Sequence, residues 1–490
     1  MTGKTFSRRR LLDDAVVLGA TALLAACGSA PAATPAKPAD AAAKPADAAK
    51  PVAAEPTKPA AAAAPKPPEA TPRPTATPAI APLPIKAGST ELKIWFHWGG
   101  ATGDRAQELI NKYNSSQGEK DKIHVTIETV RDQEYRQKMT AVRLAGTPPD
   151  VYHTAVPIKE LVKNEIVAEL PQEEQGYVKQ NYVRATVDRM TLEGKLWGYP
   201  TEFQAPALIY RKSYLKEVGA EPPKTTLELR ELAKKLTKVE GGKKTRYGFG
   251  LWYDNYPITS HLPGLIARHG GQMYSFDGDK PTKIDVASPQ AIEAISWWRG
   301  FVDDNSTQIG EMPLVDAAQN GLMATTEIEV WFTLLNLRDA GKRDIYDDLG
   351  AVPVPPKPGV QPVVFAGGWE LIGDRKSKYS DLRWQFMGWM MHKPDMPFSR
   401  FIVETIGALP APTDYPTDVP GWSKEMSEAY AKQTVAITQA HPALKVTGGG
   451  EIDSALRTAL QSIMLKKQGV EEALKEVNPK LNEILKRTDG

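Results

Sequence analysis

The stretch that decides the fold reads Gly194-Lys195-Leu196-Trp197-Gly198-Tyr199-Pro200-Thr201-Glu202-Phe203-Gln204-Ala205-Pro206-Ala207-Leu208-Ile209-Tyr210. A short aromatic strand is followed by a polar patch at 201–204, and the apolar run at 205–210 then predicts a buried strand. An unpaired buried polar group costs about 1–3 kcal/mol, so the patch needs partners or solvent. A chain that crosses between two globular bodies explains this pattern, because the patch then faces a cleft. The alternative is a single sheet with an edge loop.

The residues that follow extend the pattern. Residues 211–219 predict a short helix that ends at Gly219, and Pro222-Pro223-Lys224-Thr225-Thr226-Leu227-Glu228-Leu229 leads into the next helix. Together with 194–210, this string resembles the signature of family 1 extracellular solute-binding proteins, the sugar-type receptors of ABC importers. The resemblance covers most of 91–488 and implies an α/β fold with two lobes, the type II (clamshell) periplasmic-binding-protein fold. Each lobe would be a mostly parallel sheet flanked by helices, and the chain would cross between the lobes near 200–205.

The N-terminal residues predict an export address rather than part of the fold. Ser7-Arg8-Arg9-Arg10-Leu11-Leu12 resembles a twin-arginine motif, and the apolar stretch at 15–26 is too short to span a bilayer of about 30 Å. The stretch ends in Leu24-Ala25-Ala26-Cys27, which resembles a lipobox. Cys27 is the only cysteine of the chain, so we expect a signal peptide at 1–26 and a lipid on Cys27. Asp13 and Asp14 leave the export route, Tat or Sec, open.

Composition predicts a tether in front of a globular body without disulfides. Residues 27–88 are dominated by Ala, Pro, Thr and Lys and cannot bury enough apolar surface to fold, so we expect a disordered segment. In the polyproline form, at about 3.1 Å per residue, it would reach on the order of 150 Å. Lys and Arg number 61 against 59 Asp and Glu, a net charge of +2, which gives no reason to expect nucleic acid as a partner.

Residues 90–154 predict the first α/β unit. Two alternating apolar stretches, at 92–96 and 123–127, are separated by helical spacing, and Pro149-Asp150-Val151 opens a third strand after a second helix. Ligands of parallel sheets gather at the carboxyl ends of the strands, which points to His97-Trp98 and to His153-Thr154. The resemblance also implies that His153 and Thr154 line a sugar site. A histidine paired with the backbone at a strand end remains the alternative for His153.

Further candidate site residues come from the crossing and from the second lobe. The strand at 247–251 ends in Trp252-Tyr253-Asp254-Asn255, and an indole beside a carboxylate and an amide suits a sugar. A place in the core is the alternative for Trp252. Gln319-Asn320-Gly321-Leu322-Met323 resembles a family strand that precedes a pocket tryptophan; here that place holds Glu329, and Trp331 lies two residues further on. Gly367-Gly368-Trp369 matches a later family pattern. The predicted ligand contacts are therefore His97, Trp98, His153, Thr154, Glu202, Gln204, Trp252, Asp254, Glu329, Trp331 and Trp369.

These observations predict lobe 1 from 89–203 plus 347–406 and lobe 2 from 204–346 plus 407–490. The resemblance implies the extracytoplasmic substrate-binding component of an ABC importer, which takes a sugar or oligosaccharide in the cleft and delivers it to a membrane permease. We expect a monomer, held at the outer face of the cytoplasmic membrane through Cys27, without catalytic residues, cofactor or metal.

Two other classes stay open. One is a receptor of the same fold for a polyamine, a glycerol-phosphate type of solute or iron. The predicted site lacks the paired tyrosines that would favour iron. A polyamine would need a cleft with more carboxylates than indoles. The other is a carbohydrate hydrolase, which requires two carboxyl groups at about 5–9.5 Å across the scissile bond, and Glu202 with Glu329 is the pair to check. No serine elbow, P-loop or dinucleotide fingerprint competes with these readings.

Overall fold

The structure is a computed structural model that describes residues 80–253, 257–415 and 437–490. The chain divides into two units, Met1–Thr71 and Pro72–Gly490, and all described residues belong to the second unit. The predicted export signal, Cys27, most of the tether and Asp254 therefore lie outside the described residues.

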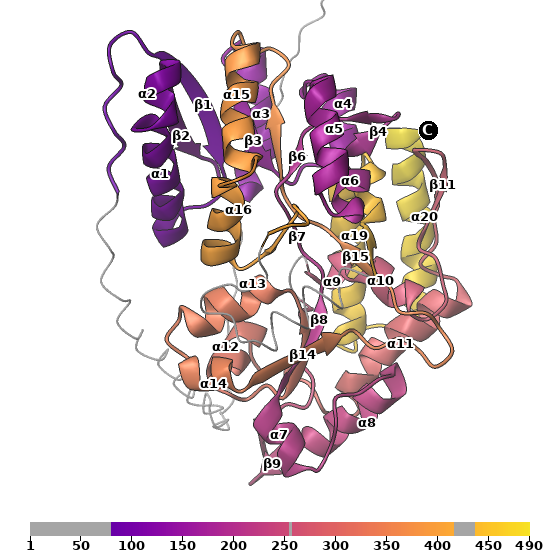
Figure 1. The fold of residues 1–490 in the computed structure, drawn as a ribbon. Helices are drawn as coiled ribbons and strands as arrows, with labels where there is room; N and C mark the ends of the chain where they lie inside the picture. The colour runs from indigo at the N-terminus through magenta and orange to yellow at the C-terminus, as the bar shows by residue number, and fades with distance from the viewer. Residues whose placement is uncertain (1–79, 254–256, 416–436) are drawn as a thin grey trace, which may run out of the picture. The chain divides into compact units, whose positions relative to one another are not determined.

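The first sheet has the strand order β2-β1-β3-β16-β6 (Figure 1). Strand β1 (Thr90–Phe96) pairs in parallel with β2 (Ile123–Thr129) and with β3 (Val151–Thr154), as the sequence predicts. Strand β16 (Glu370–Gly373) lies between β3 and β6 (Tyr199–Pro200) and is antiparallel to both. The alternation in β1 predicted one buried face, but Trp95 is also buried because β1 is a central strand covered on both faces.

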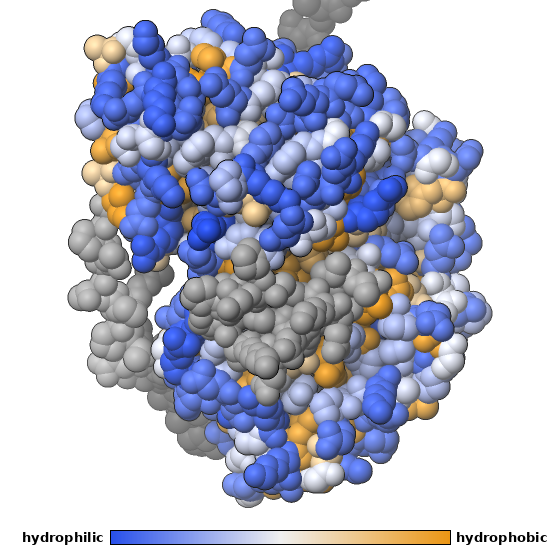
Figure 2. Space-filling view, viewed as in Figure 1, coloured by the Kyte–Doolittle hydropathy of each residue, from blue (hydrophilic) through white to orange (hydrophobic). Residues whose placement is uncertain are grey.

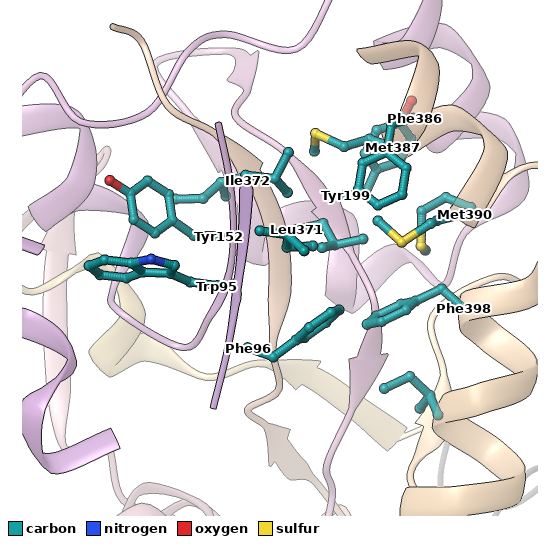
Figure 3. Close-up of a cluster of buried hydrophobic side chains, with 14 of the residues drawn as sticks. Trp95, Phe96, Tyr152, Tyr199, Leu371, Ile372, Phe386, Met387, Met390 and Phe398 are labelled. Atoms are coloured by element: carbon teal, nitrogen blue, oxygen red, sulfur yellow. The ribbon is translucent and has the colours of Figure 1, made fainter. Parts of the chain in front are cut away.

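Aromatic and sulfur-containing side chains fill the core on the first sheet. In Figure 3, side chains of the strands, such as Phe96 and Leu371, point toward side chains of α15 (Ser380–Met391) and α16 (Pro397–Phe401). On the other face of β1, the rings of Trp95 and Tyr152 meet edge to face with centroids 5.5 Å apart. Such pairs add about 0.5–1.5 kcal/mol beyond their area burial. The core residues labelled in Figure 3 are Trp95, Phe96, Tyr152, Tyr199, Leu371, Ile372, Phe386, Met387, Met390 and Phe398.

The second sheet has the order β13-β8-β14. Strand β8 (Ala207–Arg211) is antiparallel to both β13 (Thr325–Ile328) and β14 (Leu349–Pro353). Parallel bridges at Tyr247 and Gly250 extend the sheet beyond β13. The first sheet is mixed, because the ladders of β1 are parallel and those of β16 are antiparallel. The expected mostly parallel direction does not hold for the ladders of the second sheet, which are both antiparallel because β8 runs against both of its neighbours.

One predicted boundary is wrong in detail. The sequence predicts that the chain returns to the first lobe at 347, but β14 hydrogen-bonds to β8 over its full length and so belongs to the second sheet. The return follows β14, since β16 is the next strand that pairs within the first sheet. The other lobe boundaries stay predictions.

Helices with defined caps cover the second sheet. The Thr225 side chain accepts a hydrogen bond from the Glu228 amide at the start of α8 (Thr226–Leu236). The Ser288 side chain accepts one from the Ala291 amide at the start of α11 (Pro289–Asp303). Each of these caps is worth about 1 kcal/mol. Helices α19 (Gly449–Met464) and α20 (Val470–Asp489) bury their apolar faces in the core that they share with α11.

The two sheets are joined by segments that pair with one another. Between β6 and β8, the chain forms β7 (Glu202–Phe203), which pairs with β17 (Leu409–Pro410). Gln204 pairs with Gly367 in an antiparallel bridge, and the Thr201 amide donates to the Trp369 carbonyl at 3.0 Å. The predicted crossing near 200–205 therefore lies between two other crossing segments, which fix it on both sides.

The remaining described elements complete the fold. The helices are α1 (Gly100–Asn114), α2 (Gln117–Asp121), α3 (Asp132–Leu144), α4 (Ile158–Lys163), α5 (Gln172–Asn181), α6 (Arg184–Met190), α7 (Lys212–Glu217), α9 (Pro257–Ser260), α10 (Leu262–Ala267), α12 (Leu314–Gln319), α13 (Val330–Thr333), α14 (Arg343–Asp347), η1 (Leu334–Arg338), η2 (Ile402–Ile406) and η4 (Pro442–Lys445). The strands are β4 (Thr191–Leu192), β5 (Lys195–Leu196), β9 (Lys238–Glu240), β10 (Lys243–Arg246), β11 (Tyr274–Asp277), β12 (Lys280–Ile284), β15 (Val364–Ala366) and β18 (Thr438–Ala440).

Candidate functional site

Trp369 lies at the centre of a stack of rings at the end of the first sheet. Its indole is 3.4 Å from the His97 ring between centroids, with the planes 6° apart, and 5.4 Å from the His153 ring. The indole is partly exposed. Trp98 packs on the other side of this group, 4.5 Å from His153 and 4.9 Å from Phe401. The predicted candidates after β1 and β3 therefore meet Trp369, as the topology of a parallel sheet requires.

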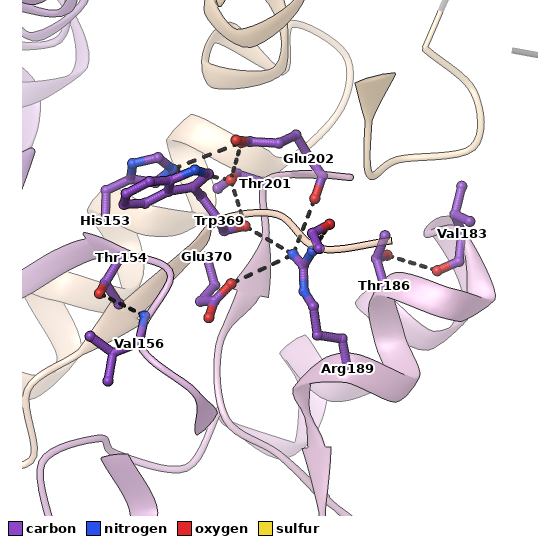
Figure 4. A network of polar contacts seen from close by, with 11 residues as sticks. His153, Thr154, Val156, Val183, Thr186, Arg189, Thr201, Glu202, Trp369 and Glu370 are labelled. Carbon is purple, nitrogen blue, oxygen red and sulfur yellow. Dashed lines mark hydrogen bonds and ion pairs between the residues drawn. The ribbon is translucent and has the colours of Figure 1, made fainter. Parts of the chain in front are cut away.

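Polar contacts tie these rings to the crossing segment (Figure 4). The Thr201 hydroxyl lies 2.6 Å from Glu202 Oε2, 2.8 Å from the Trp369 carbonyl oxygen and 3.1 Å from His153 Nε2. Thr201, Glu202 and His153 are fully buried. We call His153, Arg189, Thr201, Glu202, Trp369 and Glu370 the Thr201 cluster.

Arg189 of α6 connects the crossing segments, and the sequence analysis missed it. Its guanidinium donates to the carbonyl oxygens of Gly367 at 2.7 Å, Trp369 at 3.0 Å and Glu202 at 3.1 Å, and it lies 3.6 Å from Glu370 Oε2. The side chain is only 2% exposed. A sequence signal existed, because Arg189 follows Ala185 by four residues and therefore shares a helix face with an apolar residue.

Burial sets the charge states in the Thr201 cluster. Burial raises the pKa of Glu202 to about 7 and that of Glu370 to about 8, and Arg189 opposes both shifts. Burial also lowers the pKa of His97 to about 3 and that of His153 well below its usual value, so both rings are neutral at neutral pH.

A second group of candidates lies where the crossing meets the second sheet. Gln204, Glu329 and Trp331 line one small cavity together with Phe203, Ala205, Ala408 and Leu409. Glu329 Oε1 is 2.9 Å from His261 Nε2, and this partner holds the pKa of Glu329 below its usual value against the effect of burial. The rings of Trp331 and Trp252 are 5.9 Å apart between centroids. We call Gln204, Trp252, His261, Glu329 and Trp331 the Trp331 cluster.

The two clusters are linked through the backbone. Gln204 pairs with Gly367, whose carbonyl also accepts from Arg189, and Trp369 follows two residues later. Trp331 packs against the core of the first sheet as well as against the core that includes β8 and β13. The described candidates thus form one continuous group at the crossing, with aromatic rings and carboxylates from both sheets.

Thr154 has a local role, and the contact of His153 decides between the two readings of that residue. The Thr154 hydroxyl accepts a hydrogen bond from the Val156 amide at 3.1 Å, within its own turn. His153 bonds a side chain rather than the backbone, so the alternative reading as a backbone-paired histidine is wrong for its Nε2 atom. His261 and Thr201 were not named as site residues, although Thr201 belongs to the polar patch that the sequence analysis singled out.

The surface, the metal-ligating side chains and the helices of the described part of the chain bear on the kind of site that it can hold. On the face shown in Figure 2, hydrophilic residues cover most of the described surface and hydrophobic ones appear in small groups. No group of three or more metal-ligating side chains occurs in the part of the chain that the structure describes. None of the helices in that part combines the length and the apolar character needed to cross a membrane.

Comparisons with known proteins agree with this architecture. A protein of Brucella abortus, named as a binding protein, is 23% identical over 418 residues, which are 84% of this chain and 97% of the relative. A protein of Deinococcus radiodurans, named as an ABC transporter-binding protein, is 28% identical over 313 residues, 61% of this chain and 71% of the relative. Among solved structures, the GacH receptor of Streptomyces glaucescens, studied unliganded and with acarbose, matches with a TM-score of 0.68 at 20% identity. The match covers 82% of this chain and 99% of the receptor, and shows that the fold is the same two-lobed one.

Residues 97–395 match the family described as bacterial extracellular solute-binding protein. That range contains the second sheet, the first sheet except β1, two of the three crossing segments and every described candidate residue. The chain is a member of the bacterial extracellular solute-binding protein family.

Proposed function

We propose that this protein is the substrate-binding component of an ABC importer and that it binds a sugar or oligosaccharide between its two sheets. The observation that carries the proposal is the continuous group of indoles and carboxyl groups at the crossing, drawn from both sheets. A sugar ring presents C–H groups on its faces and hydroxyls at its edge, so it needs aromatic faces and polar acceptors side by side.

The individual residues fit these requirements. Trp369 on the side of the first sheet and Trp331 and Trp252 on the side of the second are partly exposed, as stacking platforms must be. Gln204 and Glu329 line a shared cavity, and Glu329 Oε2 is buried without a hydrogen-bond partner among the described residues. A solute hydroxyl would satisfy this oxygen. The acarbose complex of the GacH receptor supports a saccharide as the class of solute.

Export, anchoring and delivery complete the proposed role. The family is extracellular by description, and one relative is named for an ABC transporter. A lipid on Cys27, after a signal that ends at residue 26, would hold the chain at the outer face of the membrane, and the segment before β1 would give it reach. The partner would be the permease of the transporter, and the receptor would act as a monomer.

We further propose that the solute leaves unchanged. A glycoside hydrolase needs an acid and a second carboxylate on either side of the scissile bond. Glu202 is fully buried and hydrogen-bonded to Thr201, so one of the two carboxyl groups that a hydrolase would need is not presented to a solute. The hydrolase alternative therefore has less support than binding.

A thermal-shift screen tests the proposal. The chain from residue 27, with Cys27→Ser to remove the lipid site, would be heated with malto-, cello- and xylo-oligosaccharides, and with spermidine and glycerol 3-phosphate as competing classes. A saccharide at 100 times its Kd should add about 2.7 kcal/mol of stability. A shift with spermidine or glycerol phosphate but with no saccharide would contradict the sugar assignment. Mass spectrometry of the recovered saccharide should show it intact, and shorter products would favour the hydrolase.

A further inference from the structure

The contacts of the Thr201 hydroxyl require more protons than the hydroxyl has. Two oxygen atoms lie at hydrogen-bond distance from Thr201 Oγ1, Glu202 Oε2 at 2.6 Å and the Trp369 carbonyl at 2.8 Å. A hydroxyl donates one proton and accepts at two lone pairs. The Thr201 proton can serve only one of these two contacts. The Trp369 carbonyl has no proton to donate, so both contacts are hydrogen bonds only if Glu202 is protonated and donates to Thr201. With a neutral Glu202 donating to Thr201, and His153 Nε2 as the second donor, every contact of the hydroxyl is satisfied.

The charges around Glu202 lead to the same protonation state. The titratable groups packed against it are Arg189 on α6, Glu370 on β16, and His153 and His97 at the ends of β3 and β1. Arg189 lies 3.6 Å from the Glu370 carboxylate, but it contacts Glu202 through the main-chain carbonyl. One buried cation therefore faces two buried carboxyl groups, and burial raises the pKa of both, to about 7 for Glu202 and to about 8 for Glu370. A buried carboxyl group without a cation takes up a proton rather than remain charged.

We propose that Glu202 is a neutral carboxylic acid that positions Trp369 for the solute, and that it does not contact the solute as a carboxylate. Glu202 donates to Thr201, Thr201 donates to the Trp369 carbonyl, and Arg189 holds the same carbonyl oxygen from the other side. These bonds fix the backbone from which the Trp369 indole projects. The inference rests on the proposed function, because the position of Trp369 affects binding only if Trp369 contacts the solute.

This arrangement makes solute affinity depend on pH. When Glu202 loses its proton, Thr201 has to donate to the carboxylate and no longer holds the Trp369 carbonyl. Burial raises the pKa of Glu202 to about 7, so affinity should be constant below that pH and fall above it. If binding requires this one proton, Kd should rise about tenfold per pH unit above the pKa.

The variant Glu202→Gln separates the two roles of this residue. The amide has the shape of the acid, is neutral at every pH and donates an N–H bond to Thr201. Titration calorimetry with the saccharide that the wild type binds would give Kd for both proteins from pH 6 to pH 9. We expect equal Kd at pH 6, and at pH 9 a Kd of the variant that is roughly 100-fold lower than that of the wild type. Weaker binding by the variant at pH 6 would show that the solute needs the carboxylate and would overturn the proposal, as would the same loss of affinity above pH 7 in both proteins.

Two further variants control for other titrating groups and for the route of the effect. Glu329→Gln alters a carboxyl group whose pKa His261 holds below its usual value, so Glu329 does not titrate near pH 7. Whatever the affinity of the Glu329→Gln protein at pH 6, the Kd of this variant should therefore rise above pH 7 as it does in the wild type. A flat profile in Glu329→Gln would move the titration to that residue and overturn the assignment. Thr201→Val removes the link itself, so it should weaken binding at every pH; wild-type binding by Thr201→Val would contradict the role of the hydroxyl.

A measurement without solute keeps the inference separate from the proposed function. The pKa of Glu202 lies above its usual 4.5 in the folded protein, so the stability that its proton contributes is present below pH 4.5 and is lost as the pH rises to about 7. The melting temperature of the wild type relative to Glu202→Gln should fall over this range. If the melting temperatures of the wild type and of Glu202→Gln change with pH in the same way, the inference is overturned even if the protein binds saccharides. If the wild type binds no saccharide, only the proposed function is refuted.

Discussion

Gly368 is the residue whose replacement tests the crossing most locally. Its φ of +149° is a backbone conformation that residues with a side chain rarely adopt. A Cβ atom there would lie 2.2 Å from Arg189 Nη1 and 2.4 Å from the Glu202 carbonyl oxygen. Gly368→Ala should lower the free energy of unfolding by roughly 1–3 kcal/mol from backbone strain alone, with a further loss of solute affinity as Trp369 shifts. Urea denaturation and calorimetry would measure both.

The neighbouring glycine provides a matched control for this change. A Cβ atom on Gly367 would meet nothing within 4 Å, and its φ is not positive. Gly367→Ala should therefore change the free energy of unfolding by no more than about 0.5 kcal/mol. Equal effects of the two substitutions would show that the lack of space for a side chain at Gly368, between Arg189 and the Glu202 carbonyl, does not matter for stability.

At the scale of single residues, the sequence predicted the types of side chain at the site better than their partners. His97, His153 and Trp369 were named from strand ends and family pattern, and they stack as a group. Arg189 was missed because its partners are main-chain carbonyls of segments far along the chain, at 202, 367 and 369. Neither periodicity nor a motif encodes such a contact, although a charged residue on a buried helix face is a usable signal.

At the scale of elements, a buried ion pair attaches β13 to Arg268, which directly follows α10. Arg268 donates to both carboxylate oxygens of Glu327, one of them at 2.8 Å, and to the Pro355 carbonyl at 2.9 Å, and both side chains are buried. Arg268→Met leaves the Glu327 charge without a partner and should cost about 3–5 kcal/mol of stability in urea denaturation. The double variant Arg268→Met, Glu327→Leu should recover most of that loss.

The exposed pair Lys475–Glu471 on α20 is the control for this experiment. Removing its lysine with Lys475→Ala should leave the unfolding midpoint nearly unchanged, because solvent already screens both charges. If Arg268→Met were as mild as the surface change, the ion pair would contribute little to the attachment of β13.

Elements with a local signal were predicted well, and those fixed by distant pairing were not. The alternating and helical patterns gave β1, β2 and β3, because each depends on residues close in sequence. The placement of β14 was wrong because a short apolar run fits either sheet, and only its hydrogen bonds to β8 decide between them. The full burial of Trp95 likewise depends on which strands lie beside β1.

At the scale of the described unit, two sheets share three crossing segments, and the candidate residues gather where these segments pair. Sequence reasoning reached this architecture because the polar patch at 201–204 has no place inside a single core. The patch is buried for the most part, and its polar groups are paired by Arg189, Thr201 and the facing crossing segments rather than by solvent. A solute that contacts Trp369 and Trp331 at once would contact both sheets, and would therefore favour the arrangement in which the two clusters face each other.

The most direct test is a crystal structure of the protein with the saccharide that gives the largest thermal shift. The account predicts density for a sugar ring against the Trp369 indole, a second contact with Trp331 or Trp252, and a hydrogen bond from a sugar hydroxyl to Gln204. A saccharide bound to one sheet alone, away from Gln204 and Trp369, would contradict the claim that the solute is held between the sheets.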